Sequence, residues 1–213
     1  MAPMRIVTYG PDARIEPVAR EAVQVLEDAG TVVMPTDTGY VLSCNALDAS
    51  AVARVFDLTR RKYTHPVPVL VRDFRWATAL GRFDERGERL AGAFWPGALI
   101  LVVAKKDIVP AMTTGGGTTI GLRAPDHPLA QAVLTAMGYP LCGAAARATD
   151  DGAARDPAVV TAQLARASLA PDLVIDSGVL ETKDAATVVD LCGPMPRIAR
   201  QGALRADKVL PLL

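Results

Sequence analysis

The sequence predicts a single α/β domain over residues 1–213, with a twisted, mixed β-sheet and flanking helices. Segments of strand length alternate along the whole chain with segments of helical apolar spacing, and no linker, repeat or low-complexity stretch interrupts them. Hydrophobic residues make up 50% of the chain and aromatic residues 5%, which is enough for a sizeable aliphatic core. The connection at residues 36–39 is too short for a crossover helix, so the sheet is expected to contain antiparallel pairs.

Helices are predicted where apolar residues recur at every third or fourth position. Gly30 is the expected C-cap of the first helix, and Asp48 or Ser50 is the expected N-cap of the second. Pro128 suits the first turn of a later helix. The predicted helices span residues 16–29, 48–59, 85–93, 128–137 and 157–167, with one further short helix within 105–112.

Strands are predicted at short apolar runs between turn residues. Pro68 indicates an irregular or edge start for one of them, because proline donates no N–H to a ladder. Residues 113–119 contain three consecutive glycines but lack the lysine of a phosphate-binding Walker loop, so we expect a flexible loop and a lid. The predicted strands span residues 4–7, 31–34, 40–43, 67–71, 98–103, 120–123, 140–145, 173–175, 187–191 and 198–200.

A polar triplet, Thr36-Asp37-Thr38, follows the apolar run that ends at Pro35. Because proline cannot donate to the ladder, the regular pairing is expected to stop there and the triplet to lie at the strand exit. Hydroxyls and backbone amides gathered at such an end suit a small polar ligand. An ordinary strand-to-turn exit explains the same residues, since Thr and Asp are common in turns.

The densest positive segment is Arg60-Arg61-Lys62, which runs through His65 to Pro66. Cations at a helix C-terminus complement the helix dipole, so a solvated helix end is one interpretation. Three cations in succession that lead into a loop favour the other interpretation, an anion-binding site.

Composition excludes several classes of protein. Lys+Arg and Asp+Glu both number 23, so the chain has no overall charge with which to bind nucleic acid, although a local basic patch is compatible with this balance. Cys44, Cys142 and Cys192 fit neither a metal site nor a disulfide framework, and we expect a cytoplasmic location. No signal peptide and no apolar run of membrane-spanning length is present.

Several segments match, in order and at the expected intervals, the motifs of a known family. Residues 35–40 read P-T-D-T-G-Y, and Arg61 stands five residues before Pro66. On these motifs the chain resembles the YrdC/TsaC family of threonylcarbamoyl-adenylate synthases, most of all its YciO-type branch. The other matching segments are residues 95–97, 119–125, 176–178, 187–190 and 200–202.

The resemblance implies a YrdC-like fold with a concave basic cavity that binds ATP, L-threonine and bicarbonate. It implies formation of threonylcarbamoyl-AMP and pyrophosphate, and the product would feed modification of a tRNA adenosine. Mg²⁺ would be held through ATP, with no metal site on the protein. By position, the resemblance implies threonine-binding residues Thr36, Thr38, Tyr40, Arg123 and Ser177, nucleotide-binding residues Arg61, His65, Thr119, Arg147 and Arg200, and catalytic roles for Arg61, Thr38 and Arg123.

The chain departs from the family pattern at three positions. Thr59 stands where the family has lysine, and Ala145 and Arg147 stand where it has serine and asparagine. We expect Ala145 and Arg147 to line the same cavity as Thr38 and Arg123. The departures keep two alternatives open: a non-catalytic or weakly catalytic paralogue that binds nucleotide, tRNA or double-stranded RNA, and a related adenylate-forming reaction on another carbamoyl substrate.

Overall fold

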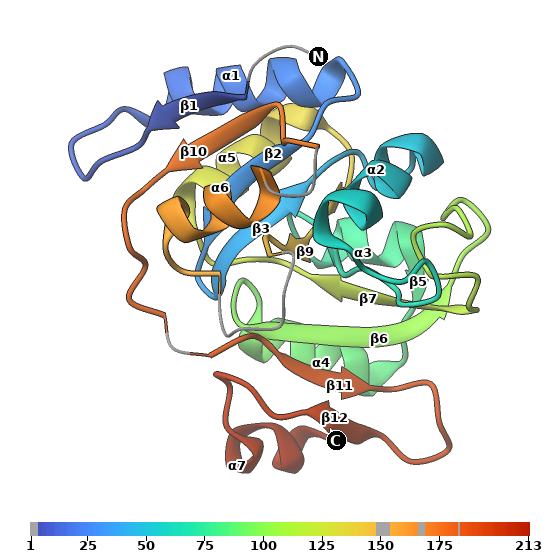
Figure 1. Ribbon diagram of the computed structural model, residues 1–213. Coiled ribbons are helices and arrows are strands. Elements are labelled where there is room, and N and C mark those ends of the chain that lie inside the picture. The colour runs from blue at the N-terminus through green and yellow to red at the C-terminus, as the bar shows by residue number, and fades with distance from the viewer. Residues whose placement is uncertain (1–3, 148–153, 166–168, 183) are drawn as a thin grey trace.

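The computed structural model describes residues 4–147, 154–165, 169–182 and 184–213 (Figure 1). It confirms the α/β class, but the strands form two mixed sheets instead of one. Figure 1 shows the second sheet below the first, with the C-terminus beside it. The helices of the described residues are α1 (Ile15–Glu27), α2 (Ala49–Thr59), α3 (Phe74–Leu80), α4 (Glu85–Phe94), α5 (Pro128–Met137), α6 (Pro157–Ala165) and α7 (Ala206–Val209), followed by the 3₁₀ turn η1 (Leu210–Leu212).

The first sheet has the order β1-β10-β2-β3-β9. β1, β10 and β2 run parallel, whereas β3 is antiparallel to both β2 and β9. Val32 and Met34 of β2 pack with α1 and α5, while Val33 between them packs with α2 and α6. This alternation buries both faces of the sheet between helices. The strands are β1 (Arg5–Thr8), β2 (Val32–Thr36), β3 (Gly39–Ser43), β9 (Ala144–Ala145) and β10 (Leu173–Asp176).

The second sheet has the order β12-β11-β6-β7-β4-β8, and β5 also pairs with β6. Alternate residues of β6 and β7, among them Leu101 and Leu122, pack against α3, α4 and the buried Val209 near the C-terminus. The opposite face of this sheet is turned toward the first sheet and carries the candidate site. The strands are β4 (Val69–Leu70), β5 (Gly81–Arg82), β6 (Leu99–Lys105), β7 (Thr119–Arg123), β8 (Leu141–Cys142), β11 (Thr187–Asp190) and β12 (Arg197–Arg200).

The predicted strand over residues 140–145 is divided at Gly143. β8 before it pairs with β4 in the second sheet, and β9 after it pairs with β3 in the first. A Cβ atom at Gly143 would lie 2.7 Å from the side chain of Leu70, so only glycine fits where the chain crosses between sheets. This crossing is where the predicted single sheet becomes two.

β2 continues through Pro35, which corrects the prediction that the proline would end the ladder. Pro35 lies opposite Tyr40. The Tyr40 N–H donates to the Ala154 carbonyl oxygen and the Tyr40 carbonyl accepts from the Ala146 N–H, so Pro35 and Tyr40 exchange no hydrogen bonds. On the other side of β2, pairing with β10 ends at Val33. The missing N–H of Pro35 therefore leaves no gap in the sheet.

Two helix predictions were wrong in detail. α1 has its C-cap at Asp28, and Ala29 adopts the left-handed φ of 57° that was expected at Gly30. Gly30 is needed for a close approach instead, because a Cβ atom there would lie 2.6 Å from the Val25 carbonyl oxygen. Residues 106–112 form turns and no helix. The N-cap role of Asp48 is confirmed, since its carboxylate accepts the N–H groups at the start of α2.

Candidate functional site

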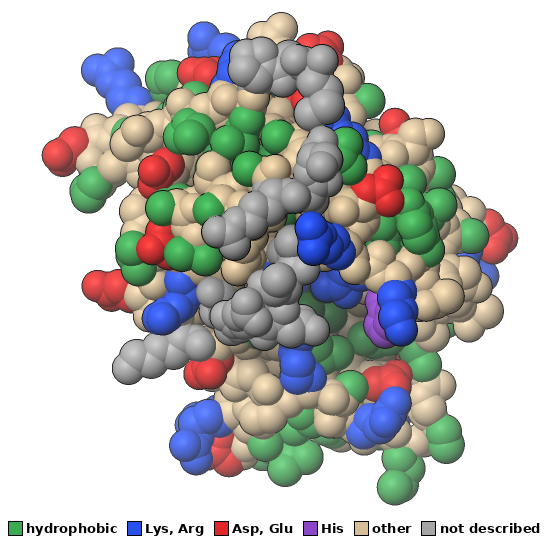
Figure 2. Space-filling model, viewed as in Figure 1, with side chains coloured by type: hydrophobic (Ala, Val, Ile, Leu, Met, Phe, Trp, Pro, Cys, Tyr) green, Lys and Arg blue, Asp and Glu red, His purple; other side chains and the backbone are tan. Residues whose placement is uncertain are grey.

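A cavity of about 270 Å³ opens between the β2–β3 hairpin and the second sheet. Figure 2 shows several Lys and Arg side chains around the hollowed middle of this face. Among the described lining residues, four are arginines and one, Asp184, is acidic. The lining consists of Thr38, Tyr40, Val41, Arg61, Pro68, Ile100, Arg123, Gly143, Ala145, Arg147, Ala154, Asp184, Ala185, Ala186 and Arg200.

Sheet register explains why Arg200 and Arg123 share this cavity. Arg200 of β12 lies opposite Val188 of β11, and Val188 lies opposite Ile100 of β6. β6 and β7 pair so that Ile100 comes next to Arg123 in the same row. All four side chains therefore lie on the face away from α3 and α4. Three strand spacings separate the two arginines, which is roughly 14 Å between their backbones.

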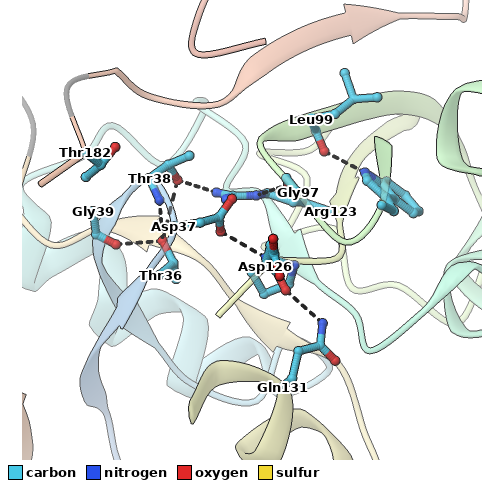
Figure 3. Close-up of polar contacts among 12 residues, drawn as sticks. Thr36, Asp37, Thr38, Gly39, Gly97, Leu99, Arg123, Asp126, Gln131 and Thr182 are labelled. Atoms are coloured by element: carbon cyan, nitrogen blue, oxygen red, sulfur yellow. Dashed lines mark hydrogen bonds and ion pairs between the residues drawn. The ribbon is translucent and has the colours of Figure 1, made fainter. Parts of the chain in front are cut away.

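Arg123 is held by three residues from two segments of the chain (Figure 3). Its Nε donates to the Gly97 carbonyl oxygen at 2.9 Å, Nη1 to Thr38 Oγ1 at 2.5 Å and Nη2 to Asp37 Oδ1 at 2.5 Å. The side chain is 4% exposed, and burial lowers its pKa while the nearby Asp37 carboxylate acts in the opposite direction. A buried guanidinium needs such a counter-ion and such acceptors, and Arg123 has both.

The hairpin turn gives the two threonines of the triplet different positions. Thr36 is buried, and its hydroxyl donates to the Gly39 carbonyl oxygen at 2.6 Å, which closes the turn. The Thr36 hydroxyl also accepts the Thr38 N–H at 3.2 Å. Thr38 consequently directs its own hydroxyl to Arg123 at the edge of the cavity.

Tyr40 lines the cavity, but its hydroxyl is engaged on the protein. The hydroxyl donates to the Gly178 carbonyl oxygen and accepts the Ser177 N–H, both at 2.8 Å. Burial raises the pKa of Tyr40 to about 12. Tyr40 therefore ties the hairpin to the segment after β10 that leads to the cavity wall at Asp184.

Arg61, Arg147 and Arg200 gather at the other end of the cavity. The Arg200 Nη2 donates to the Ala186 carbonyl oxygen at 2.8 Å, which anchors the guanidinium. Burial lowers the pKa of Arg200, and the positive charges of Arg147 and Arg61 add to that effect. Three guanidiniums gathered in one hollow are an arrangement that can attract an anion of high charge.

The structure brings together six of the predicted site residues and leaves four outside the cavity. The six that line it are Thr38, Tyr40, Arg61, Arg123, Arg147 and Arg200. The prediction that Ala145 and Arg147 line the cavity with Thr38 and Arg123 is confirmed. The four described residues that do not line it are Thr36, His65, Thr119 and Ser177.

The position of Thr36 was explained by the hairpin turn, and each of the other three residues outside the cavity has its own physical reason. His65 lies on the exposed loop after α2. Thr119 starts β7 whereas Arg123 ends it, so the two lie roughly 13 Å apart along one strand. Ser177 contributes its backbone N–H to Tyr40. Their assignments to substrate and nucleotide stay predictions.

Sequence reasoning assigned no role to Asp37, Gly97, Ile100 or Asp184. Asp37 stood in the polar triplet, which was the available signal. Gly97 belonged to the matching segment 95–97, but nothing in the sequence linked it to Arg123. Ile100 and Asp184 carry no local signal, because register and folding bring them to the cavity. Within the described parts of the chain, no three His, Cys, Asp or Glu side chains form a metal-binding group.

The glycine-rich segment is not a lid in this structure. Thr113 and Thr114 are buried, and the Thr113 hydroxyl donates to the Ala46 carbonyl oxygen at 2.7 Å. The Val67 N–H donates to the Thr113 carbonyl oxygen at 3.2 Å. The segment thus packs beneath the basic loop of residues 60–66, and none of its residues lines the cavity.

A family model named Sua5_yciO_yrdC, described as "telomere recombination", matches residues 24–202. A putative threonylcarbamoyl-AMP synthase of Mycobacterium tuberculosis is 34% identical over 197 residues, covering 90% of this chain and 87% of that protein. Within the described parts of the chain, no helix is both long and apolar enough to cross a membrane.

Two solved structures are similar over nearly the whole chain. Pyrococcus abyssi Sua5 complexed with L-threonine has a TM-score of 0.91 at 27% identity, over 98% of this chain. This chain spans 60% of the length of that protein. Escherichia coli YciO has a TM-score of 0.84 at 27% identity, and the match covers 100% of both chains.

Proposed function

Since the chain belongs to the Sua5/YciO/YrdC family, we propose that it forms threonylcarbamoyl-AMP from L-threonine, bicarbonate and ATP. The observation that carries this proposal is one cavity with arginine side chains at two ends. Arg123 with Thr38 forms one end, and Arg61, Arg147 and Arg200 form the other. A single guanidinium suits an amino-acid carboxylate, and several guanidiniums suit a triphosphate.

The Arg123 end suits the threonine carboxylate. A guanidinium has five N–H donors, and among the described residues the contacts above use one from each nitrogen. One N–H on Nη1 and one on Nη2 can then bind a carboxylate in a bidentate manner. The Thr38 hydroxyl lies beside this pair as a further polar group for the ligand. The L-threonine complex of P. abyssi Sua5 supports this assignment.

The three-arginine end suits the phosphates of ATP. In the proposed step a carbamate oxygen attacks the α-phosphorus while pyrophosphate leaves, and negative charge develops on the phosphate oxygens. Positioned guanidiniums stabilise that charge, and no side-chain nucleophile is required. Arg200 suits this work because the Ala186 carbonyl oxygen already fixes it. Mg²⁺ would enter with ATP and add charge neutralisation at the phosphates.

The product would be passed to tRNA adenosine modification, which makes a cytoplasmic location the expected one. Arg60 and Lys62 are exposed next to Arg61, and Arg147 lines the cavity. These cations favour the second candidate, a paralogue that binds nucleotide, tRNA or double-stranded RNA through phosphate contacts without efficient catalysis.

Pyrophosphate release separates the two candidates. The purified protein is incubated with ATP, Mg²⁺, L-threonine and bicarbonate, and each component is omitted in turn. A synthase releases pyrophosphate only in the complete mixture. ATP binding in calorimetry without pyrophosphate release under any condition supports the binding paralogue. Release that persists without threonine shows that ATP is cleaved independently of the amino acid and contradicts the proposed reaction.

A further inference from the structure

The two ends of the cavity differ in the number of guanidiniums, and the single guanidinium at one end, Arg123, has a counter-ion in direct contact. Arg123 forms an ion pair with Asp37 at 2.5 Å, and the two side chains are only 4% and 19% exposed. At the other end, the pKa of Arg200 is lowered by burial and by two more guanidiniums. Asp184 is the acidic residue there among the described lining residues, and it is exposed. The charge of Arg123 is therefore largely offset by one carboxylate, whereas three guanidiniums are gathered at the other end.

Asp37 does not line the cavity, whereas Arg123 and Thr38 do. Its carboxylate acts on the cavity through its contact with Arg123. Asp37 Oδ1 accepts both Arg123 Nη2 and the backbone N–H of Asp126, the latter at 3.0 Å (Figure 3). The carboxylate is thus fixed between the hairpin turn and the loop before α5, behind the guanidinium.

We propose that Asp37 is a positioning and specificity-determining residue. It holds Arg123 in place and offsets its charge, so that this end takes a single carboxylate and excludes phosphate groups. The inference rests on the proposed function, because it assigns the Arg123 end to an amino acid.

The discrimination follows from Coulomb's law. The repulsion between Asp37 and an incoming anion grows with the charge of that anion, so a phosphate or polyphosphate is disfavoured more than a carboxylate. Low solvent exposure of the ion pair keeps this repulsion from being screened. Without Asp37, the buried Arg123 guanidinium would lose the carboxylate that offsets its charge, and a polyphosphate would compete for the place of the amino acid.

The test uses L-threonine and inorganic pyrophosphate as calorimetric probes. Asp37→Asn removes the charge but keeps an oxygen that can accept from Arg123 and from the Asp126 N–H. Wild-type protein is expected to bind pyrophosphate without competitive loss of threonine. Asp37→Asn is expected to bind a second pyrophosphate, with threonine displaced competitively and an apparent threonine Kd raised about tenfold at saturating pyrophosphate.

Two further variants are matched controls. Asp126→Asn removes one negative charge from the loop before α5. The Asp126 side chain is exposed, and only its backbone N–H contacts Asp37, so this variant should behave as wild type. Asp37→Glu restores a carboxylate and should restore the exclusion of pyrophosphate. A merely structural role for Asp37 would weaken both ligands alike and leave their ratio unchanged.

Either of two results would overturn the inference: an unchanged ratio of threonine to pyrophosphate affinity in folded Asp37→Asn, or competitive displacement of threonine by pyrophosphate in the wild type. The second needs no variant, so it holds even if Asp37→Asn does not fold. Absence of threonine binding by the wild type would instead count against the proposed function, and the pyrophosphate stoichiometry of Asp37→Asn would still decide the role of Asp37.

Discussion

Gly115 lies directly against the backbone of Thr64. A Cβ atom at Gly115 would be 2.7 Å from both the carbonyl carbon and the carbonyl oxygen of Thr64. The next residue, Gly116, has a similar left-handed φ, +81° against +61°, but a Cβ atom there would meet no atom within 4 Å. The glycine-rich turn therefore supports the loop that presents Arg61 to the cavity.

Gly115→Ala should weaken ATP binding, because the added methyl group forces the loop of residues 60–66 away from the turn. Gly116→Ala is the matched control: both substitutions place a side chain in the left-handed region at roughly 1–2 kcal/mol, but only the first produces a clash. Calorimetry with ATP measures the effect, and urea unfolding corrects for stability. Equal losses of ATP affinity in both variants would mean that strain in the turn, and not contact with Thr64, is responsible.

Arg61→Ala should weaken ATP binding by about 1.5–3 kcal/mol, the scale of a hydrogen bond to a charged group. Lys62→Ala removes the same charge from the next position, which is exposed and does not line the cavity, and it should have little effect at moderate salt. Calorimetric titration of both variants gives the comparison. Unchanged affinity in Arg61→Ala would remove that side chain from the nucleotide site.

Tyr40→Phe should lower the free energy of unfolding by about 1–3 kcal/mol, because the Ser177 N–H and the Gly178 carbonyl oxygen both lose their partner. Tyr139→Phe, which removes one longer hydrogen bond to Leu26, should cost less. Urea unfolding at pH 8 measures both differences. A cost for Tyr40→Phe no larger than that of Tyr139→Phe would contradict the tie between hairpin and cavity wall.

The same variant gives a pH test with a definite sign. The pKa of Tyr40 rises from 10.0 to about 12 on folding, chiefly because of burial. The unfolded chain then ionises first, so the stability that the neutral phenol contributes is complete below pH 10 and is lost as the pH rises toward 12. The difference in unfolding free energy between wild type and Tyr40→Phe should shrink over that window. A difference that stays constant to pH 12 would show that Tyr40 titrates normally.

Local pattern predicted most helices and strands of this fold, and motif order predicted the family. It failed where distant segments decide the structure. The periodicity of residues 16–29 is enough to predict α1, because it is a property of that segment alone. The place of Pro35 within β2 depends on distant residues, since Ala146 and Ala154 form the two backbone hydrogen bonds of Tyr40. The division of one sheet into two depends on how closely Leu70 approaches Gly143.

Prediction of the site from the sequence had the same limit. Arg123, Arg61 and Arg200 were found from motifs, but the row that aligns Arg200 with Ile100 and Arg123 arises from strand register. Thr119 was assigned to the nucleotide by motif; it stands at the far end of β7 and does not line the cavity, and its assignment stays a prediction. Asp37 was visible in the sequence, but its bond to Arg123 was not.

Ala145→Ser combined with Arg147→Asn should raise threonine- and bicarbonate-dependent pyrophosphate release if the missing hydroxyl and amide limit catalysis. The two positions line one cavity and are changed together, because neighbouring site residues rarely act additively. About a tenfold increase requires about 1.4 kcal/mol of barrier lowering, less than one positioned donor can supply. A fall in activity would show instead that loss of the Arg147 guanidinium from the phosphate end outweighs the gain of the hydroxyl and the amide.

The proposed function requires that one cavity holds an amino acid at Arg123 and a nucleotide at Arg61 and Arg200. The most direct measurement is the formation of a threonine-containing adenylate from isotopically labelled L-threonine, ATP and bicarbonate, followed by mass spectrometry. We expect a labelled threonylcarbamoyl-AMP that appears together with pyrophosphate and disappears in Arg123→Ala. Pyrophosphate without labelled adenylate, or a labelled product that Arg123→Ala forms as fast as the wild type, would contradict it.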